Sequence, residues 1–267
     1  MRKSILSTVV TLGLAGGLSA CDVEQPDPGC IVQDATAGNW WATFDAVDAP
    51  QGACEDFKPL VGDELGVWKF ADPVANTSIL VIRPLGLAAL GKFDTDNTAT
   101  GFAKLQATGN LSIDKDAEQF CTADGFTPAG VLANQGAFAE DPEDITYQFG
   151  KVRVYSNPGA PGTQMTGELS YTNNGCTAKY VMRAIWPAVA CDPRLDTNEP
   201  ANAPSTCGSG SGINPDFAVA CATLPEELWT GAFLTEEDEA YIEENDAYPP
   251  TYREGKCTPT SNIPSFK

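Results

Sequence analysis

Residues 145–185 read ITYQFGKVRVYSNPGAPGTQMTGELSYTNNGCTAKYVMRAI, and this stretch decides the fold. Apolar and polar residues alternate along most of it, which is typical of β-strands with one buried face and one exposed face. Asn174-Gly175 is the strongest two-residue hairpin signal, and a turn there pairs Asn173 with Cys176. One face of this hairpin is apolar and carries Met165, Gly167, Leu169, Tyr171, Ala178, Tyr180, Met182 and Ala184. The stretch therefore predicts an antiparallel meander that packs one face on a core.

The alternation changes phase at Gly150. Tyr147 and Phe149 precede this glycine on one parity, and Val152 and Val154 follow it on the other. An extra residue in one strand exchanges its two faces, and glycine tolerates the resulting bend. We therefore expect a β-bulge at Gly150.

The polar face of the hairpin carries three charged residues. Glu168 is expected to lie diagonally between Lys179 and Arg183. Exposed ion pairs of this kind contribute little free energy, roughly 0–1 kcal/mol. We interpret the three residues as a solvated face and not as a catalytic set.

Stretches that precede the meander also have the character of strands. Residues 40–47 alternate, residues 67–71 are short, and residues 78–83 are continuously apolar and β-branched, as in a strand covered on both faces. Residues 101–113 are a weaker strand or strand pair. With the meander, these stretches predict a mainly β domain over residues 37–191, an antiparallel sandwich or open barrel.

Residues 192–267 differ in character and are expected to form a disulfide-stapled, loop-rich extension. Prolines and a run of alternating glycine and serine fill residues 192–216, which is the composition of a loop or linker. Helical signals lie within residues 224–248, where Thr235 precedes Asp238 by the spacing of a capping box. The extension should therefore contain a short helix.

Residues 1–20 have the organisation of a secretory signal peptide. Arg2 and Lys3 give a positive start, residues 5–18 form an apolar run, and small residues lead to a cut site. About 14 apolar residues suit a signal core and are few for a membrane span of about 20. We expect residues 1–20 to be removed on export.

The end of this signal, Leu18-Ser19-Ala20-Cys21, resembles the lipobox of bacterial lipoproteins. In that family the cysteine is diacylated and becomes the new N-terminus. The resemblance therefore implies that Cys21 is lipidated, and that the protein is anchored to the non-cytoplasmic face of the inner or outer membrane of the cell envelope. Residues 21–36, polar with two prolines, would be the lipidated N-terminus and tether. An ordinary signal peptide followed by an unrelated cysteine is the alternative.

The chain contains nine cysteines. If Cys21 carries lipid, an even number remains, which indicates disulfides in an exported protein. These are Cys30, Cys54, Cys121, Cys176, Cys191, Cys207, Cys221 and Cys257. Zinc sites need close pairs such as C-x-x-C, and no two of these remaining cysteines are closer than fourteen residues. Four disulfides are expected, with the pairing open because roughly a hundred arrangements are allowed.

The formal net charge is −20, and the acids are scattered along the chain. Such a surface repels nucleic acid and anionic lipid head groups, so we expect no nucleic-acid partner and anchoring by the acyl chains alone. We interpret the charge as a source of solubility, the alternative being a site for cations or a basic partner.

The chain contains no histidine. This excludes Ser-His-Asp and Cys-His nucleophiles and histidine-ligated metal sites. If the remaining cysteines are all oxidised, thiol catalysis is excluded as well. We therefore expect no catalytic residues, no cofactor and no bound metal.

Short motifs that could carry chemistry are interpreted as polar turns. Ser112-Ile113-Asp114-Lys115 resembles the S-x-x-K motif of penicillin-binding proteins and serine β-lactamases, but the later K-T-G is absent. Asp94-x-Asp96-Asn97 and Asp114-x-Asp116-x-Glu118 offer oxygen ligands to calcium, but lack the glycine and distal glutamate of an EF-hand.

The leading hypothesis is a non-enzymatic envelope lipoprotein with a binding or structural role, whose partner is an unidentified protein, glycan or lipid. Gly38-Asn39-Trp40 resembles the G-x-W of lipocalins, and implies as an alternative a barrel that carries an apolar ligand in a cavity of at least about 300 Å³. A carboxylate-dependent glycan hydrolase is the second alternative, and would need two acids roughly 5–10 Å apart in one cleft.

Overall fold

The computed structural model describes residues 29–51, 54, 57, 59–95, 104–134, 142–196 and 198–267. The expected signal peptide, Cys21 and the first part of the tether lie outside the described residues. Among the described residues, no helix has both the length and the apolar character to cross a membrane.

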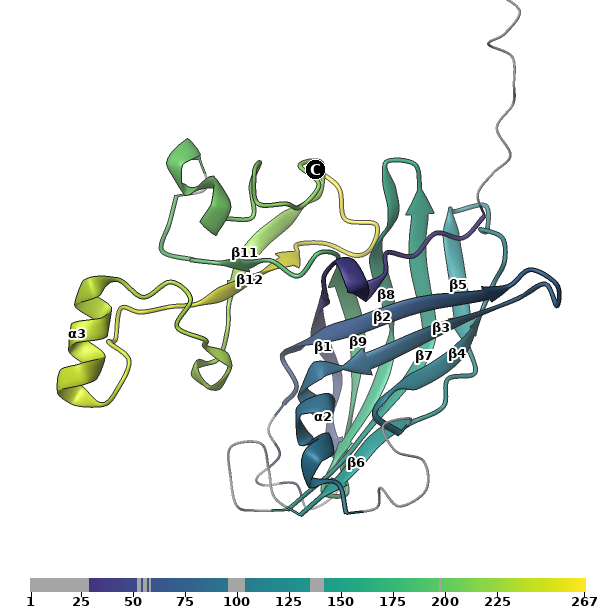
Figure 1. Cartoon of the computed structure of the whole chain (residues 1–267), viewed down its shortest axis with the longest axis horizontal. Helices are drawn as coiled ribbons and strands as arrows, with labels where there is room; N and C mark the ends of the chain where they lie inside the picture. The colour runs from purple at the N-terminus through teal and green to yellow at the C-terminus, as the bar shows by residue number, and fades with distance from the viewer. Residues whose placement is uncertain are drawn as a thin grey trace, which may run out of the picture.

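The prediction of a mainly β fold is confirmed, and the main sheet is antiparallel and nine-stranded. Its strands are β1 (Trp40–Gln51), β2 (Gly62–Asp72), β3 (Thr77–Pro84), β4 (Ala107–Leu111), β5 (Phe120–Asp124), β6 (Ala129–Ala133), β7 (Glu143–Asn157), β8 (Ala160–Asn173) and β9 (Cys176–Ile185). They follow the order β5-β4-β3-β2-β1-β9-β8-β7-β6, and β5 also pairs with β7. This extra pairing closes the sheet into a barrel (Figure 1).

The barrel closes because two short strands share one long neighbour. Phe120 of β5 lies opposite Tyr155 of β7, while Ala129 of β6 lies opposite Tyr147 of the same strand. β5 also pairs with β4, so it joins the two ends of the sheet. The expectation of an open barrel or sandwich is thus refined to a closed barrel.

The predicted register of the β8–β9 hairpin is confirmed, since Asn173 lies opposite Cys176. All side chains predicted on its apolar face are buried, apart from Gly167, which has none. The predicted bulge in β7 is confirmed too, because the register shifts between Gly150 and Arg153. The residue with left-handed backbone is, however, Lys151, with φ of 47°.

Glu168 lies opposite Val181 and thus diagonally between Lys179 and Arg183, as expected, but the ion pair expected with these two residues is wrong. The bulge in β7 brings Lys151 beside Glu168, and their charged atoms are 2.8 Å apart. Arg183 instead donates two hydrogen bonds of 2.7 and 2.9 Å to the carboxylate of Asp45, on β1. The pairing of β1 with β9 explains this contact, and the spacing of the β8–β9 hairpin does not reveal that pairing.

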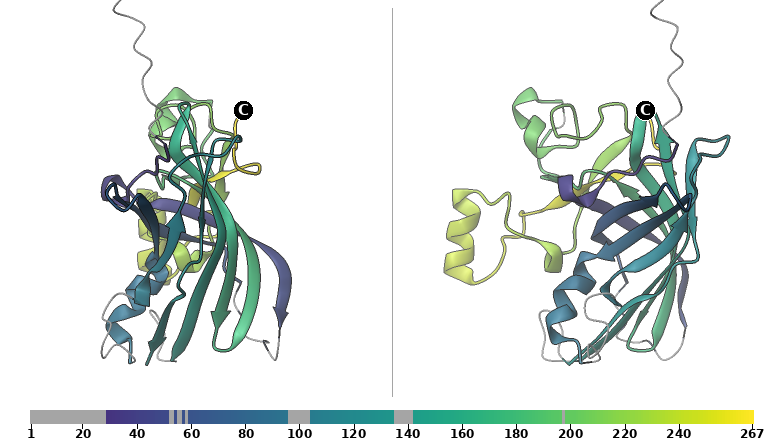
Figure 2. Two further views of the ribbon diagram at one scale, coloured as in Figure 1. Left: turned by 90° about the vertical axis from the view of Figure 1, so that its right-hand side faces the viewer. Right: turned by 45° about the vertical axis from the view of Figure 1, so that its right-hand side comes forward.

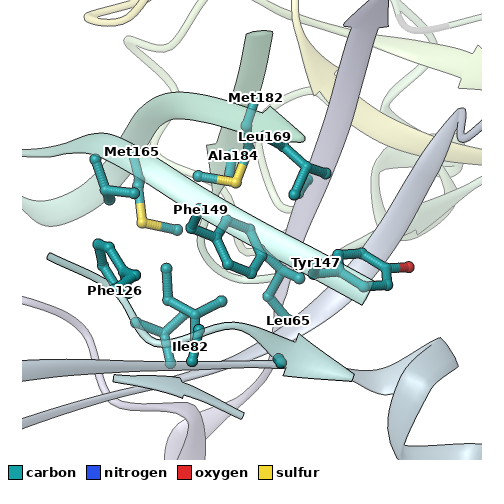
Figure 3. Packing of buried hydrophobic residues seen from close by; sticks show 14 of the residues in the cluster. Leu65, Ile82, Phe126, Tyr147, Phe149, Met165, Leu169, Met182 and Ala184 are labelled. Carbon is teal, nitrogen blue, oxygen red and sulfur yellow. The ribbon is translucent and has the colours of Figure 1, made fainter. Parts of the chain in front are cut away.

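Large apolar side chains fill the barrel interior (Figure 3). The labelled members of this core are Leu65, Ile82, Phe126, Tyr147, Phe149, Met165, Leu169, Met182 and Ala184. Each large side chain contributes roughly 1.5–3 kcal/mol when fully buried. At one end Trp40 is buried, and its indole N–H donates to the carbonyl of Gln33 at 3.0 Å. A helix that the sequence did not predict, α2 (Leu85–Leu90), packs Leu87 and Leu90 into this core.

Residues 192–267 are less loop-like than expected, because they contribute two strands of a second sheet beside the barrel (Figures 1 and 2). Its strands are β10 (Ala190–Cys191), β11 (Val219–Thr223) and β12 (Gly255–Pro259), with β12 in the middle. The predicted helix and its capping box are confirmed in α3 (Glu236–Asn245), which Thr235 caps. The short 3-10 helices are η2 (Ala35–Ala37), η3 (Gly91–Phe93), η5 (Pro200–Ser205) and η6 (Glu226–Leu228).

The eight cysteines in the described part of the chain form four disulfides. Cys30–Cys121 and Cys54–Cys176 brace the barrel, and Cys191–Cys221 and Cys207–Cys257 brace the second sheet. The Cys191–Cys221 bridge crosses β12 over Gly255, where an added Cβ would lie 2.6 Å from the sulfur of Cys221. Only glycine fits beneath this disulfide.

Candidate functional site

The S-x-x-K serine takes part in a turn. The Ser112 hydroxyl accepts the backbone N–H of Thr122 at 3.0 Å, and it lies 3.5 Å from the sulfur of Cys30. These contacts join β4 to β5 and secure the start of the described chain. The Ser112 hydroxyl therefore has a structural role. Neither of these two contacts is with a base that could activate the hydroxyl as a nucleophile.

The acidic stretch after this serine is also a polar turn. Asp116 accepts the backbone N–H groups of Glu118 and Phe120 at 2.9 and 2.8 Å. Both carboxylates bind the guanidinium of Arg153, at 2.9 Å for Asp116 and 2.8 Å for Glu118. Arg153 thus supplies the positive charge that a calcium ion would otherwise provide. In the other candidate, Asp94 forms a bridge with Ala133, and Asp96 and Asn97 lie outside the described residues.

A groove of about 560 Å³ lies on the outer wall of the barrel. We call it the outer groove. It is lined by residues of four adjacent strands, namely Val47 and Asp48 of β1, Gln148, Phe149 and Gly150 of β7, Glu168, Leu169 and Ser170 of β8, and Lys179, Tyr180 and Val181 of β9. This volume falls in the range of about 300–1,000 Å³ that is typical of ligand sites.

The outer groove arises from an irregularity in β1. This strand pairs regularly with β9 as far as Ala46, and its register then shifts between Ala46 and Asp48 and again before Gln51. The end of β1 remains paired with β9, because Asp48 lies opposite Lys179 and Gln51 lies opposite Thr177, and the register shifts bend this part of the strand (left view of Figure 2). The bent strand forms one side of the groove, and the outward side chains of the next strands form its floor.

The outer groove combines apolar and charged groups. Val47 and Val181 are 57% and 38% exposed, although valine is a residue that usually lies in the core. Asp48 and Lys179 add one charge of each sign, and Glu168 lies with its partner Lys151. The groove therefore suits a ligand that has a small apolar group next to a polar or charged one.

The two acids of the outer groove differ from a glycosidase pair. The side chain of Glu168 is 58% exposed and bound to a lysine. A general acid needs a carboxyl whose pKa is raised by shielding from water. The described groove therefore gives the hydrolase alternative no support.

A carboxyl that the sequence analysis missed lies in the barrel wall. Asp63, in β2, accepts the backbone N–H of Gly86 at 3.2 and 3.3 Å and the hydroxyl of Tyr147 at 3.4 Å. Burial raises the pKa of Asp63 to about 7. Its position two residues before the buried Leu65 was the available signal, since alternate residues of a strand share a face.

The Asp63→Asn variant is expected to lose part of the pH dependence of folding. The carboxyl has a pKa of 3.8 ordinarily and about 7 in the fold, so the folded state binds the proton more tightly. The free energy of unfolding therefore falls as the pH rises from about 4 to about 7, and this contribution is constant above. A full shift corresponds to about 4 kcal/mol, and we expect about 2 kcal/mol because the side chain is partly exposed.

Urea unfolding near pH 4 and near pH 8 measures this effect, because these values lie at the two ends of the interval. The stability difference between the two pH values should be about 2 kcal/mol smaller in Asp63→Asn than in the native protein. Asp45→Asn, which alters an exposed acid on β1, is the matched control. Equal pH dependence in the native protein and Asp63→Asn would rule out a proton held by Asp63.

The barrel interior bears on the lipocalin-like alternative. A carrier needs an internal cavity, whereas side chains fill the described interior and the cavity of about 560 Å³ lies on the outer wall. The closed barrel agrees with the resemblance at Gly38-Asn39-Trp40, but the filled interior opposes transport of an apolar ligand inside it.

Comparison with known proteins gives two findings. A family model described as MlpA matches residues 38–187, which span the barrel from β1 to β9. A protein of Myxococcus xanthus named "Putative lipoprotein MlpA" is 39% identical over 274 residues, and the match covers 100% of each chain. No solved structure matches the chain significantly.

Proposed function

Since the chain belongs to the MlpA family of lipoproteins, we propose that it is a membrane-anchored, non-enzymatic binding protein of the bacterial envelope. The lipid on Cys21 would hold it on the non-cytoplasmic face of a membrane. The outer groove would bind a segment of an envelope protein that presents a small apolar side chain beside a charged one. The observation that carries this proposal is the groove itself, in which two exposed valines lie beside charged and polar side chains.

The distance between the anchor and the groove supports this assignment. The backbone of Gln33, near the start of the described chain, donates to the carbonyl of Gly162 at 2.9 Å. Glu168 and Ser170 of the groove lie further along the same strand, β8. At about 3.3 Å per residue, some 20–25 Å of strand separates this contact from the groove. An occupant of the groove would therefore not collide with the membrane.

Photocrosslinking in the bacterium that makes this lipoprotein tests the groove. Val181→p-benzoylphenylalanine places a reactive group in the groove of the otherwise intact chain. Tyr241→p-benzoylphenylalanine, on α3, is the matched control, since Val181 and Tyr241 are 38% and 37% exposed. Irradiation should give one discrete adduct at position 181 and none at position 241, and mass spectrometry of the adduct identifies the partner.

A second variant links the adduct to the groove. Adding Val47→Asp to the chain that carries the photoreactive group should reduce the adduct at least several-fold, because it places a charge on the apolar wall. No discrete adduct at position 181, or the same adducts at both positions, would count against the groove as the binding surface.

A further inference from the structure

The hairpin of β2 and β3 exposes an apolar surface on its outer face. Trp68 and Val81 lie opposite each other, as do Phe70 and Ile79, so these four side chains share one face. Val81 is buried and Trp68 and Ile79 are half-buried, whereas Phe70 is 56% exposed and Val74, in the connecting turn, is 96% exposed. None of residues 78–83 is exposed, as expected for a strand covered on both faces, and the exposed apolar surface lies beyond them, toward the turn. We call Trp68, Phe70, Val74 and Ile79 the β2–β3 tip.

The β2–β3 tip lies at the end of the barrel where the described chain begins. The amine of Lys69 donates to the carbonyl of Cys30, and the backbone N–H of Cys30 donates to Ile113 at 3.0 Å. The Cys30–Cys121 disulfide secures the same segment to β5. In Figure 1 the turn between β2 and β3 projects beyond the neighbouring strands, at the right of the view.

The reach of the tether is short. Eight residue steps separate Cys21 from Gly29, and an extended chain spans at most about 3.3–3.6 Å per residue. A lipid on Cys21 would therefore keep Gly29 within about 30 Å of the membrane surface. The β2–β3 tip is next to this point, and the outer groove is further away along β8.

The charge around the β2–β3 tip is suited to a lipid surface. Residues 67–83 contain Lys69 and Arg83 but only one acid, Asp72, whereas the whole chain has a formal net charge of −20. The most acidic parts of the chain would be repelled by anionic head groups, while this hairpin would not. Tryptophan and phenylalanine are also the residues that membrane-surface segments place at the boundary between head groups and acyl chains.

We propose that the β2–β3 tip inserts into the surface of the same membrane that holds the lipid anchor. This inference rests on the proposed anchor at Cys21. The acyl chains would supply most of the attachment, and the tip would fix the orientation of the barrel on the membrane. The outer groove would then face the same direction in every molecule.

Oxidative footprinting of the full-length lipidated protein tests this contact. The protein is reconstituted into vesicles of phosphatidylcholine and phosphatidylethanolamine and compared with the Cys21→Ser chain in solution. Oxidation of Trp68 and Phe70 by hydroxyl radicals should fall at least threefold in the vesicles. Oxidation of Leu228 and Tyr241, which lie in the extension and are 39% and 37% exposed, should be unchanged.

A pair of charge variants gives the second measurement. Lipidated Val74→Asp should remain on the vesicles but lose the protection of Phe70. Leu132→Asp adds the same charge to an exposed residue of β6, and should keep the protection.

The outcomes separate the two proposals. Failure of the lipidated native protein to float with vesicles would overturn the anchor. Flotation with Trp68 and Phe70 oxidised as in solution would overturn only the insertion of the tip. Protection in native envelopes but not in vesicles would also overturn it, because a protein would then cover this surface.

Discussion

Replacing Cys21 with serine is expected to move the protein from the membrane fraction to the soluble fraction. Serine cannot take the thioether-linked diacyl group, so the chain would lose every acyl chain of its anchor. Each methylene of an acyl chain contributes about 0.8 kcal/mol to membrane binding when it is buried in the bilayer. Two acyl chains therefore suffice for stable attachment, which is lost without them. The described part of the chain offers no helix that could replace the anchor. Fractionation of cells with an antibody against the protein measures the change.

A neighbouring substitution is the control for this experiment. Asp22→Asn alters the residue after Cys21 and leaves the Cys21 thiol in place, so this variant should stay with the membranes. If Cys21→Ser fractionates like the native protein, Cys21 is not the anchor, and the orientation that we infer from it has no basis.

Gly162→Ala is expected to destabilise the barrel by about 3 kcal/mol. Gly162 has φ of +67°, and an added Cβ would lie 2.2 Å from the carbonyl oxygen of Ile31 and 2.7 Å from the Cα of Val32. These are backbone atoms, so no rotamer change relieves the clash. The alanine would also weaken the hydrogen bond from Gln33 to the Gly162 carbonyl. Urea unfolding without reductant measures the loss.

Gly150→Ala is the matched control. An added Cβ at Gly150 meets nothing within 4 Å, and the positive φ at this bulge belongs to Lys151. We therefore expect a change of less than about 0.5 kcal/mol. Equal stability of the two variants would show that the segment after Cys30 can move away from Gly162 without loss of stability. The barrel would then not depend on the contact between this segment and β8.

The elements that the sequence predicted well depend on local chemistry. Asn174-Gly175 fixes a two-residue turn, and the turn fixes every pairing of β8 with β9 back to Gln164 and Ile185. The capping box is equally local, because the side chains of Thr235 and Asp238 each accept the backbone N–H of the other residue within one helical turn. Such signals lie within a few residues and need no knowledge of the rest of the fold.

Features that the sequence did not predict depend on contacts between distant residues. The barrel is closed by the pairing of β5 with β7, and its sheet places β1 beside β9; no local pattern reports which strands meet. The helix α2 has six apolar or small residues directly after Pro84, and it is held by the burial of Leu87 and Leu90 in the core. The partner of Arg183 follows from the strand order, since Asp45 reaches it across the β1–β9 contact.

The outer groove could not be predicted from the sequence for a related reason. Residues 40–47 were interpreted as an alternating strand, but Ala46, Val47 and Asp48 are all exposed where the register of β1 shifts against β9. The side chains of the groove come from four strands, and each of them resembles an ordinary surface residue in its own segment. The lipobox at Cys21 is the opposite case, because four consecutive residues carry the whole signal.

The order of the cysteines along the chain has a consequence for how the protein matures. Cys30 joins Cys121 and Cys54 joins Cys176, while Cys191 joins Cys221 and Cys207 joins Cys257, so the bridges interlace in two pairs. A chain that emerges from a secretion channel and is oxidised in sequence would join nearest neighbours, and every such bridge would be non-native. Thiolate attack on a formed bridge is the reaction that repairs this. A chain oxidised in this order therefore reaches its native bridges only through thiol–disulfide exchange as well as oxidation.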